Sequence, residues 1–139
     1  QAAIELEMSA PDSINDTVMQ GVYPFAIDEN SDISVIRLKN LIKCIIQDVA
    51  KNTAVQVISA RFHRTMAQVI IETCKLLATK TDIKTVALSG GVFQNRLLLR
   101  LAIDGLEKEG FTALSHKVVP CNDGGLALGQ AVIAQHINS

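Results

Sequence analysis

The amino-acid sequence predicts an α/β fold in which long helices pack on a central sheet. Two long segments with apolar residues at three-to-four spacing lie between residues 35 and 78, which is typical of amphipathic helices. Two short apolar runs follow, at residues 84–88 and 111–115, and each leads through a glycine pair into a further helical segment. In this strand–helix–strand–helix order, ligands bind at the carboxyl ends of the strands.

The composition indicates one globular domain. Of the 139 residues, 48% are hydrophobic and 19% are charged. The net charge is −1 and no basic block occurs, so we expect no nucleic-acid partner. No apolar stretch approaches the roughly 20 residues that span a bilayer, and there is no secretory signal, so we expect no membrane association. Cys44, Cys74 and Cys121 lie far apart without a C-x-x-C pair, which favours reduced thiols in a cytoplasmic protein.

The N-terminal quarter is predicted to be irregular after one short helix. Residues 1–9 carry the end of a helix, which Pro11 terminates, and residues 10–17 form a polar loop. A short strand is expected at residues 22–27, where a proline restricts it to an edge, and a polar turn at residues 28–34.

The first long helix is predicted to begin at Val35 and to end near Val49. Thr53 then caps a second helix, which runs to about Ala78. After the strand at residues 84–88, a third long helix covers residues 92–109.

The last third of the sequence holds the second strand and the final helix. Gly110 follows the third helix as a C′ glycine. The second strand at residues 111–115 comes next, and the last helix begins after the turn at residues 122–125.

The first glycine pair, Gly90-Gly91, joins a strand to a helix. Glycine has no Cβ, so it can adopt a positive φ and let a ligand oxygen lie against the backbone. Backbone N–H groups at a helix N-terminus then bind phosphate. The same glycines also suit a tight turn without a ligand. The spacings of the dinucleotide and P-loop fingerprints are absent, so both interpretations stay open.

Asn95 and Asp123 are polar residues beside the two glycine pairs. The amide of Asn95, one helical turn after Gly91, can contact a ribose or phosphate, or satisfy a neighbouring loop carbonyl. Asp123 precedes Gly124-Gly125 and the last helix, where it can cap that helix or ligate a divalent cation. Two such turns in one small domain indicate a nucleotide held between them.

The histidines are weaker candidates for chemistry. His63 lies in mid-helix beside the apolar face, where it is either a hydrogen-bonded, partly buried residue or reaches a cleft. His116 and His136 are expected at the surface, and no two histidines have the spacing of metal ligands. Cys121 has no base beside it in the sequence, so no chemical role is assigned to it.

Four segments together resemble one known family. Residues 86–99 and 119–131 contain the two glycine pairs, residues 62–67 read Phe-His-Arg-Thr-Met-Ala, and residues 1–7 open the chain. They resemble the HypF carbamoyltransferases of nickel–iron hydrogenase maturation over essentially the whole chain. The two glycine motifs, in this order and after a matching long helix, are quite specific.

The resemblance implies a fold, an activity and partners. The fold is the C-terminal half of an actin-like ATPase module, which is ribonuclease H-like, with residues 1–139 forming one nucleotide-binding subdomain of a larger carbamoyltransferase. In the family, carbamoyl phosphate supplies a carbamate and ATP activates it as carbamoyl-adenylate. The carbamoyl group then passes to the C-terminal cysteine of the acceptor protein HypE.

Matching positions carry the family's site onto this sequence. Gly90 and Gly91 would hold the nucleotide phosphates through backbone N–H groups, and Asn95 would contact the nucleotide. Asp123 would ligate the bound metal ion, and the Gly124-Gly125 pair would let its loop close on the adenylate. No catalytic residue is assigned.

The sequence also departs from the family. The paired histidines that complete the family's metal site have no equivalent here, nor have its other regions, so we expect a fragment without turnover of its own. Self-association through the face that meets the missing half is a further expectation. Two alternatives remain, namely a related tRNA threonylcarbamoyl-adenosine enzyme and a non-catalytic interaction module whose glycine turns are purely structural.

Overall fold

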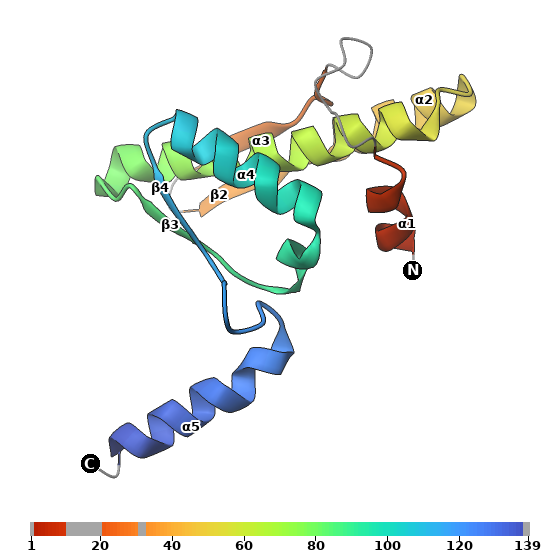
Figure 1. The fold of residues 1–139 in the computed structure, drawn as a ribbon. Helices are drawn as coiled ribbons and strands as arrows, with labels where there is room; N and C mark the ends of the chain where they lie inside the picture. Colours follow the sequence, from red (N-terminus) through yellow and green to blue (C-terminus); the bar gives the residue numbers. More distant parts are fainter. Residues whose placement is uncertain (1, 11–20, 31–32, 138–139) are drawn as a thin grey trace.

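A computed structural model of the chain describes residues 2–10, 21–30 and 33–137 (Figure 1). Most of the regular structure is helical. In chain order the elements are α1 (Ala2–Met8), β1 (Ala26–Asn30), β2 (Ile33–Arg37), α2 (Lys39–Ala50), α3 (Val55–Thr81), β3 (Thr85–Leu88), the 3-10 turn η2 (Gly91–Gln94), α4 (Arg96–Lys108), β4 (Thr112–Ser115), the 3-10 turn η3 (Asp123–Gly125) and α5 (Leu126–Ile137).

The predicted strand–helix–strand unit is present. β3 and β4 pair in parallel from Thr85 opposite Thr112 to Leu88 opposite Ser115, and α4 makes the crossover between them. The core cluster of buried residues joins α3 to this unit. Its members are Ile71 on α3, Leu88 on β3, Ala102 and Leu106 on α4, and Phe111 just before β4. The fold is therefore mixed α/β, as predicted, although the described residues form two-stranded sheets in place of a larger central sheet.

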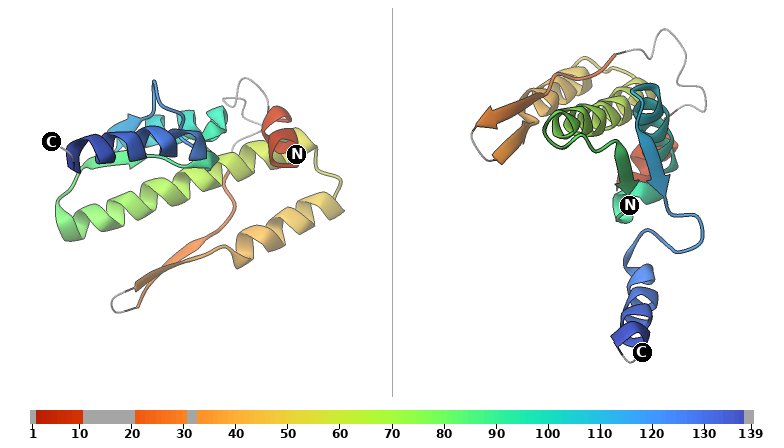
Figure 2. Two further views of the ribbon diagram at one scale, coloured as in Figure 1. Left: turned by 90° about the horizontal axis from the view of Figure 1, so that it is seen from below. Right: turned by 90° about the vertical axis from the view of Figure 1, so that its left-hand side faces the viewer.

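Helices α3 and α4 lie close together because Gly105 has no side chain. A Cβ at Gly105 would lie 2.2 Å from Cδ1 of the buried Ile71. The apolar stripe of α4, with Leu98, Ala102 and Leu106 buried, faces this contact. These two helices form the main packed layer of the molecule (Figure 2).

Several helix boundaries differ from those that the sequence predicts. α4 begins at Arg96, because the residues after Gly90 form η2 and the extended Asn95 then caps the helix. The N-cap of α3 is Ala54, without a side-chain hydrogen bond, so the predicted cap by Thr53 is wrong. α3 continues to Thr81, beyond the predicted end. Gly110 has a φ of 81°, as expected for a glycine that ends a helix.

The predicted turn at residues 28–34 and the helix start at Val35 are wrong. β1 and β2 form an antiparallel hairpin with Asp28 opposite Val35, and α2 begins only at Lys39. The β-branched residues Ile33, Val35 and Ile36 suit a strand, and this preference prevails over the helical spacing that Val35 shares with the residues after it. The loop expected at residues 10–17 lies outside the described residues, except for Ala10.

A buried tyrosine ties the N-terminal segments to α3. The Tyr23 backbone N–H donates to Thr65 Oγ1 at 2.8 Å, and its hydroxyl donates to Asp48 on α2 at 2.8 Å. Arg61 on α3 pairs with the same carboxylate at 2.8 Å. Burial, and after it the hydrogen bond to Asp48, raises the pKa of Tyr23 from 10.0 to about 12.

Helix α5 differs from the other long helices. None of its residues is buried, and Figure 1 and the right-hand view of Figure 2 show it below α3 and α4, away from both. Its apolar side chains are exposed, among them Leu126, Leu128, Val132, Ile133 and Ile137. None of the helices in the described ranges is long and apolar enough to cross a lipid bilayer.

Candidate functional site

The two glycine turns meet at the carboxyl ends of β3 and β4. The Gly90 N–H donates to the Cys121 carbonyl oxygen at 2.9 Å, which joins the first turn directly to the segment before the second. Ser89 and Gly125 line one cavity of about 320 Å³ between them. Residues that are far apart in the sequence are thus brought to the edge where open parallel sheets bind ligands.

The first turn presents backbone to solvent. Gly90 has a φ of 103°, a conformation that glycine adopts without strain. A Cβ at Gly91 would have no atom within 4 Å, so the backbone there is open to an approaching ligand. The first N–H groups of η2 have no acceptor within the turn itself, which is the arrangement that binds anions. The N–H of Gly90 differs, because Cys121 already accepts it.

The second turn is capped by Asn122. The Asn122 Oδ1 accepts the Gly124 N–H at 3.0 Å, so the capping role, which was one of the two interpretations of Asp123, belongs to its neighbour. The Asp123 side chain is exposed, and no described residue donates to its carboxylate. Gly125 is required sterically, because a Cβ there would lie 2.8 Å from the Pro120 carbonyl oxygen.

Asn95 is held by protein groups at both ends of its amide. Its Oδ1 accepts the Leu98 N–H at 2.8 Å and so caps α4. Its Nδ2 lies 2.8 Å from His63 Nε2 on α3. Asn95 therefore has a structural role, although its partners are a helix N-terminus and a histidine in place of a loop carbonyl. One Nδ2 hydrogen remains for a ligand.

His63 is buried and hydrogen-bonded, and it also lines a cavity, so both interpretations of this residue hold. Its side chain is 2% exposed, and Nδ1 lies 2.8 Å from the Ser59 carbonyl oxygen one turn earlier in α3. A carbonyl only accepts, so Nδ1 carries the proton and Nε2 accepts from Asn95. No local sequence pattern indicates this pair, because the two residues lie 32 positions apart on different helices.

A largely apolar cavity of about 690 Å³ opens beside this pair. Its walls come from α1, α3 and the turn before α4, and they include the predicted site residues Gly91 and Asn95. Most of the lining is apolar, with His63, Asn95 and Glu7 among the few polar groups, as in many small-molecule sites.

Helix α1 closes one side of this cavity, which the sequence did not predict. The Glu7 carboxylate accepts the Arg96 N–H at 2.8 Å at the start of α4. The Ser59 hydroxyl donates to the Leu6 carbonyl oxygen. Both contacts join residues that are far apart in the chain, so no local pattern reports them.

The remaining histidines lie at the surface, as expected. His116 is exposed, and its Nε2 lies 2.8 Å from Ser89 Oγ across the ends of the paired strands. His136 is exposed near the end of α5. All three cysteines are free thiols.

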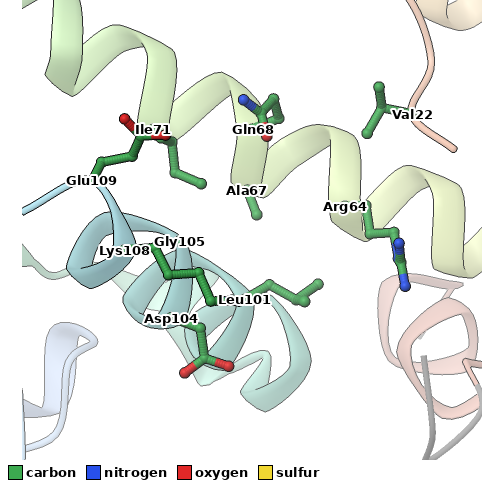
Figure 3. Close-up of a pocket in the computed structure, with 10 residues that line it drawn as sticks. All are labelled: Val22, Arg64, Ala67, Gln68, Ile71, Leu101, Asp104, Gly105, Lys108 and Glu109. Atoms are coloured by element: carbon green, nitrogen blue, oxygen red, sulfur yellow. The ribbon is translucent and has the colours of Figure 1, made fainter. Parts of the chain in front are cut away.

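A second groove, of about 420 Å³, lies between α3 and α4 (Figure 3). Side chains from both helices line it, among them Gln68 and Asp104, and Val22 adds to one end. It contains none of the predicted site residues, so the cavity beside Asn95 is the stronger candidate.

The family resemblance predicts Asp123 as one ligand of a metal site that histidines outside this chain complete. Among the residues that the structure describes, no three His, Cys, Asp or Glu side chains gather closely enough to hold a metal ion.

Comparison with known proteins gives the family. The family model described as the second subdomain of the Kae1-like domain of carbamoyltransferases matches residues 1–130. This chain belongs to the HypF carbamoyltransferase family. A crystal structure of full-length HypF in the phosphate- and nucleotide-bound form is similar, with a TM-score of 0.84 and 40% identity over 98% of this chain and 17% of that chain.

Curated HypF relatives are similar over nearly all of this chain. The carbamoyltransferase HypF of Synechocystis sp. is 33% identical over 94% of this chain and 16% of its own length. The HypF homolog of Cupriavidus necator is 34% identical over 96% of this chain and 34% of its own length. The chain therefore spans about a third or less of these HypF proteins.

The chain is also similar to a protein outside the HypF family. The tRNA N6-adenosine threonylcarbamoyltransferase of Dictyoglomus turgidum is 29% identical over 75% of this chain. The HypF family model, which covers residues 1–130, favours membership of HypF over this related group.

Proposed function

We propose that this chain supplies one wall of a site that binds ATP and carbamoyl-adenylate in a carbamoyltransferase. The observation that carries the proposal is the Gly90–Cys121 hydrogen bond, which joins the two glycine turns at the carboxyl ends of β3 and β4. Membership of the HypF family supports the reaction class. The similar crystal structure of full-length HypF is in a phosphate- and nucleotide-bound form, which supports the ligand class.

Each predicted residue has a role that suits its position. Gly90 sets the turn through its positive φ, and Gly91 offers its N–H to a nucleotide phosphate. Asn95 offers its remaining amide hydrogen to the nucleotide. Asp123 ligates a divalent metal ion that histidines outside this chain complete, and the Gly124-Gly125 pair lets the loop approach the adenylate.

The wider reaction belongs to the same proposal. Carbamoyl phosphate and ATP are the substrates, and HypE accepts the carbamoyl group on its C-terminal cysteine. We expect no turnover by this chain alone, because it offers one side of the site and no catalytic residue. The cytoplasm is the proposed compartment, in keeping with three free cysteines.

Titration with ATP and Mg²⁺ tests the proposal. We expect the amide resonances of Gly91, Asn95 and Asp123 to shift in the wild-type chain. A Gly91→Asp substitution puts a carboxylate where the phosphate binds and should abolish the shifts at Asn95. Gly91→Ala is the matched control, because its Cβ meets no atom within 4 Å and adds no charge.

A non-catalytic module with structural turns is the second candidate. The cap that Asn95 forms favours it, because the amide oxygen is already used within the chain. Wild-type resonances that stay unchanged at millimolar ATP would support this candidate and contradict nucleotide binding.

A further inference from the structure

Three partly or fully buried hydrogen bonds connect α1, α3 and the start of α4. The Ser59 hydroxyl donates to the Leu6 carbonyl, His63 Nδ1–H donates to the Ser59 carbonyl at 2.8 Å, and Asn95 Nδ2 donates to His63 Nε2 at 2.8 Å. We infer that His63 is a positioning residue, which orients the Asn95 amide toward an acceptor atom of a ligand in the 690 Å³ cavity. The inference rests on the proposed nucleotide site.

The orientation of an asparagine amide is set by its hydrogen-bond partners, because its oxygen and nitrogen ends have nearly the same shape. At one end, the Leu98 N–H requires the oxygen. At the other end, His63 Nε2 requires the nitrogen, since Nδ1 carries the imidazole proton. Both ends agree, so the amide has one orientation.

This orientation leaves one donor available. The Asn95 nitrogen has two hydrogens, and His63 takes one of them. No described residue accepts the other, although both side chains line the cavity. A ligand that offers an oxygen or ring nitrogen there is recognised by the second hydrogen, and a ligand that offers only a donor is not.

A purely structural role for His63 is the competing explanation. A buried imidazole stabilises the protein when both nitrogens are satisfied, as they are here, whether or not a ligand binds. The two roles differ in their effect on ligand affinity, because a structural residue changes the fraction of folded protein and not the affinity of the folded form.

Three variants of the chain separate these roles. His63→Phe keeps the ring volume and removes the acceptor for Asn95. His63→Gln restores an acceptor near the position of Nε2. Thr65→Val is the matched control, because Thr65 is also fully buried on α3 and accepts the Tyr23 N–H, away from the cavity.

The measurement is the dissociation constant for ATP with Mg²⁺, determined well below each variant's melting temperature. We expect His63→Phe to weaken binding by about threefold to tenfold, as loss of one hydrogen bond does. His63→Gln should recover most of the affinity, and Thr65→Val should bind as the wild type does while melting earlier.

Several results would overturn the inference. Unchanged affinity in His63→Phe would overturn it while leaving nucleotide binding intact. Equal losses of affinity in His63→Phe and Thr65→Val would also overturn it, because the loss would then not depend on the contact with Asn95. A wild-type chain that binds no ATP would remove the proposed function and this inference with it.

Imidazole nitrogen spectra of the wild-type chain provide a test that needs no variant. We expect the Nδ1–H tautomer of His63 and a scalar coupling between Asn95 Nδ2 and His63 Nε2 that persists when ATP is added. The opposite tautomer, or a coupling that ATP abolishes, would contradict the inference even if His63→Phe failed to fold.

Discussion

The two glycine turns share a sequence pattern but differ in how firmly this chain holds them. The first turn follows the buried Leu88, packs Phe93 against the core cluster, and is held by the contact of Asn95 with α3. The second turn depends on the hydrogen bond of Cys121 to Gly90 and on its own Asn122 cap. It leads into α5, which has no buried residue.

The difference shows that a glycine turn is fixed by the helix that follows it. α4 packs its apolar stripe on α3, and this packing sets the position of the first turn. α5 has no such contact with the described core, so its apolar residues do not position the second turn. The first turn is therefore preorganised by this chain, and the second is not.

Matched leucine truncations should give the largest contrast between the two regions. Leu106 is fully buried on α4, whereas Leu128 on α5 is 53% exposed. Leu106→Ala should lower the free energy of unfolding by about 2 to 5 kcal/mol through lost burial and a cavity. Leu128→Ala should change it by less than about 0.5 kcal/mol.

Urea denaturation followed by far-ultraviolet circular dichroism measures both changes. Equal destabilisation by the two truncations would mean that α5 is packed in solution, and the contrast between the turns would fail.

The ionisation of Tyr23 tests how firmly α3 is packed, and α3 is the helix that holds the first turn. Its pKa is raised from 10.0 to about 12 in the folded protein, so folding favours the neutral phenol. This stabilisation, of at most about 3 kcal/mol, is fully present below pH 10 and is lost as the pH rises from about 10 to 12. α3, which holds the first turn, should loosen over this range.

Absorbance near 295 nm reads this titration directly, because the sequence has one tyrosine and no tryptophan. Tyr23→Phe is the control, and it should remove the loss of stability between pH 10 and 12. Ionisation of the folded chain at pH 10 would contradict a buried phenol bonded to Asp48.

A pair of asparagine substitutions gives a smaller contrast within the turns themselves. Asn95→Ala removes the cap of α4 and leaves the buried His63 Nε2 without its donor, at a cost of about 1 to 3 kcal/mol. Asn122→Ala removes only an exposed cap, which should fray α5 without much change in global stability.

Hydrogen exchange distinguishes the local effect from the global one. Faster exchange in α3 after Asn122→Ala would show that the two turns stabilise each other more than their structures indicate.

Much of the fold could be predicted because strong local signals determine it. The spacing of apolar residues located α3, α4 and α5, and Gly110 marked the end of α4. The order of strand, glycine pair and helix predicted the strand–helix–strand unit, and in the structure β3 and β4 of this unit pair in parallel. Each of these features depends on side chains that are close together in the sequence.

The errors arose where short segments satisfied two patterns. Val35 fits a helical spacing and also a strand, and its partner across the hairpin decided for the strand. An Asp at position 123 can cap a helix, but the 3-10 turn begins at Asp123, so Asn122 before it provides the cap. Thr53 lies one residue too early to cap α3, which begins after Ala54.

The candidate site was predicted only in part, because its supports are distant in the sequence. Gly91 and Asn95 line the main cavity, but no local signal linked Asn95 to His63 or placed Glu7 at the start of α4. The ligands of these residues stay a prediction.

The missing side chain at Gly105 affects the cavity beside Asn95, although Gly105 does not line that cavity. A methyl group there would meet Ile71 at 2.2 Å, so either Ile71 must turn aside or the two helices must part. Parting the helices would carry Asn95 away from His63, since each residue sits on or beside one of them. The absent methyl group therefore sets the spacing of the two helices and, with it, the shape of the cavity. A substitution at Gly105 changes that shape without altering any residue that lines the cavity.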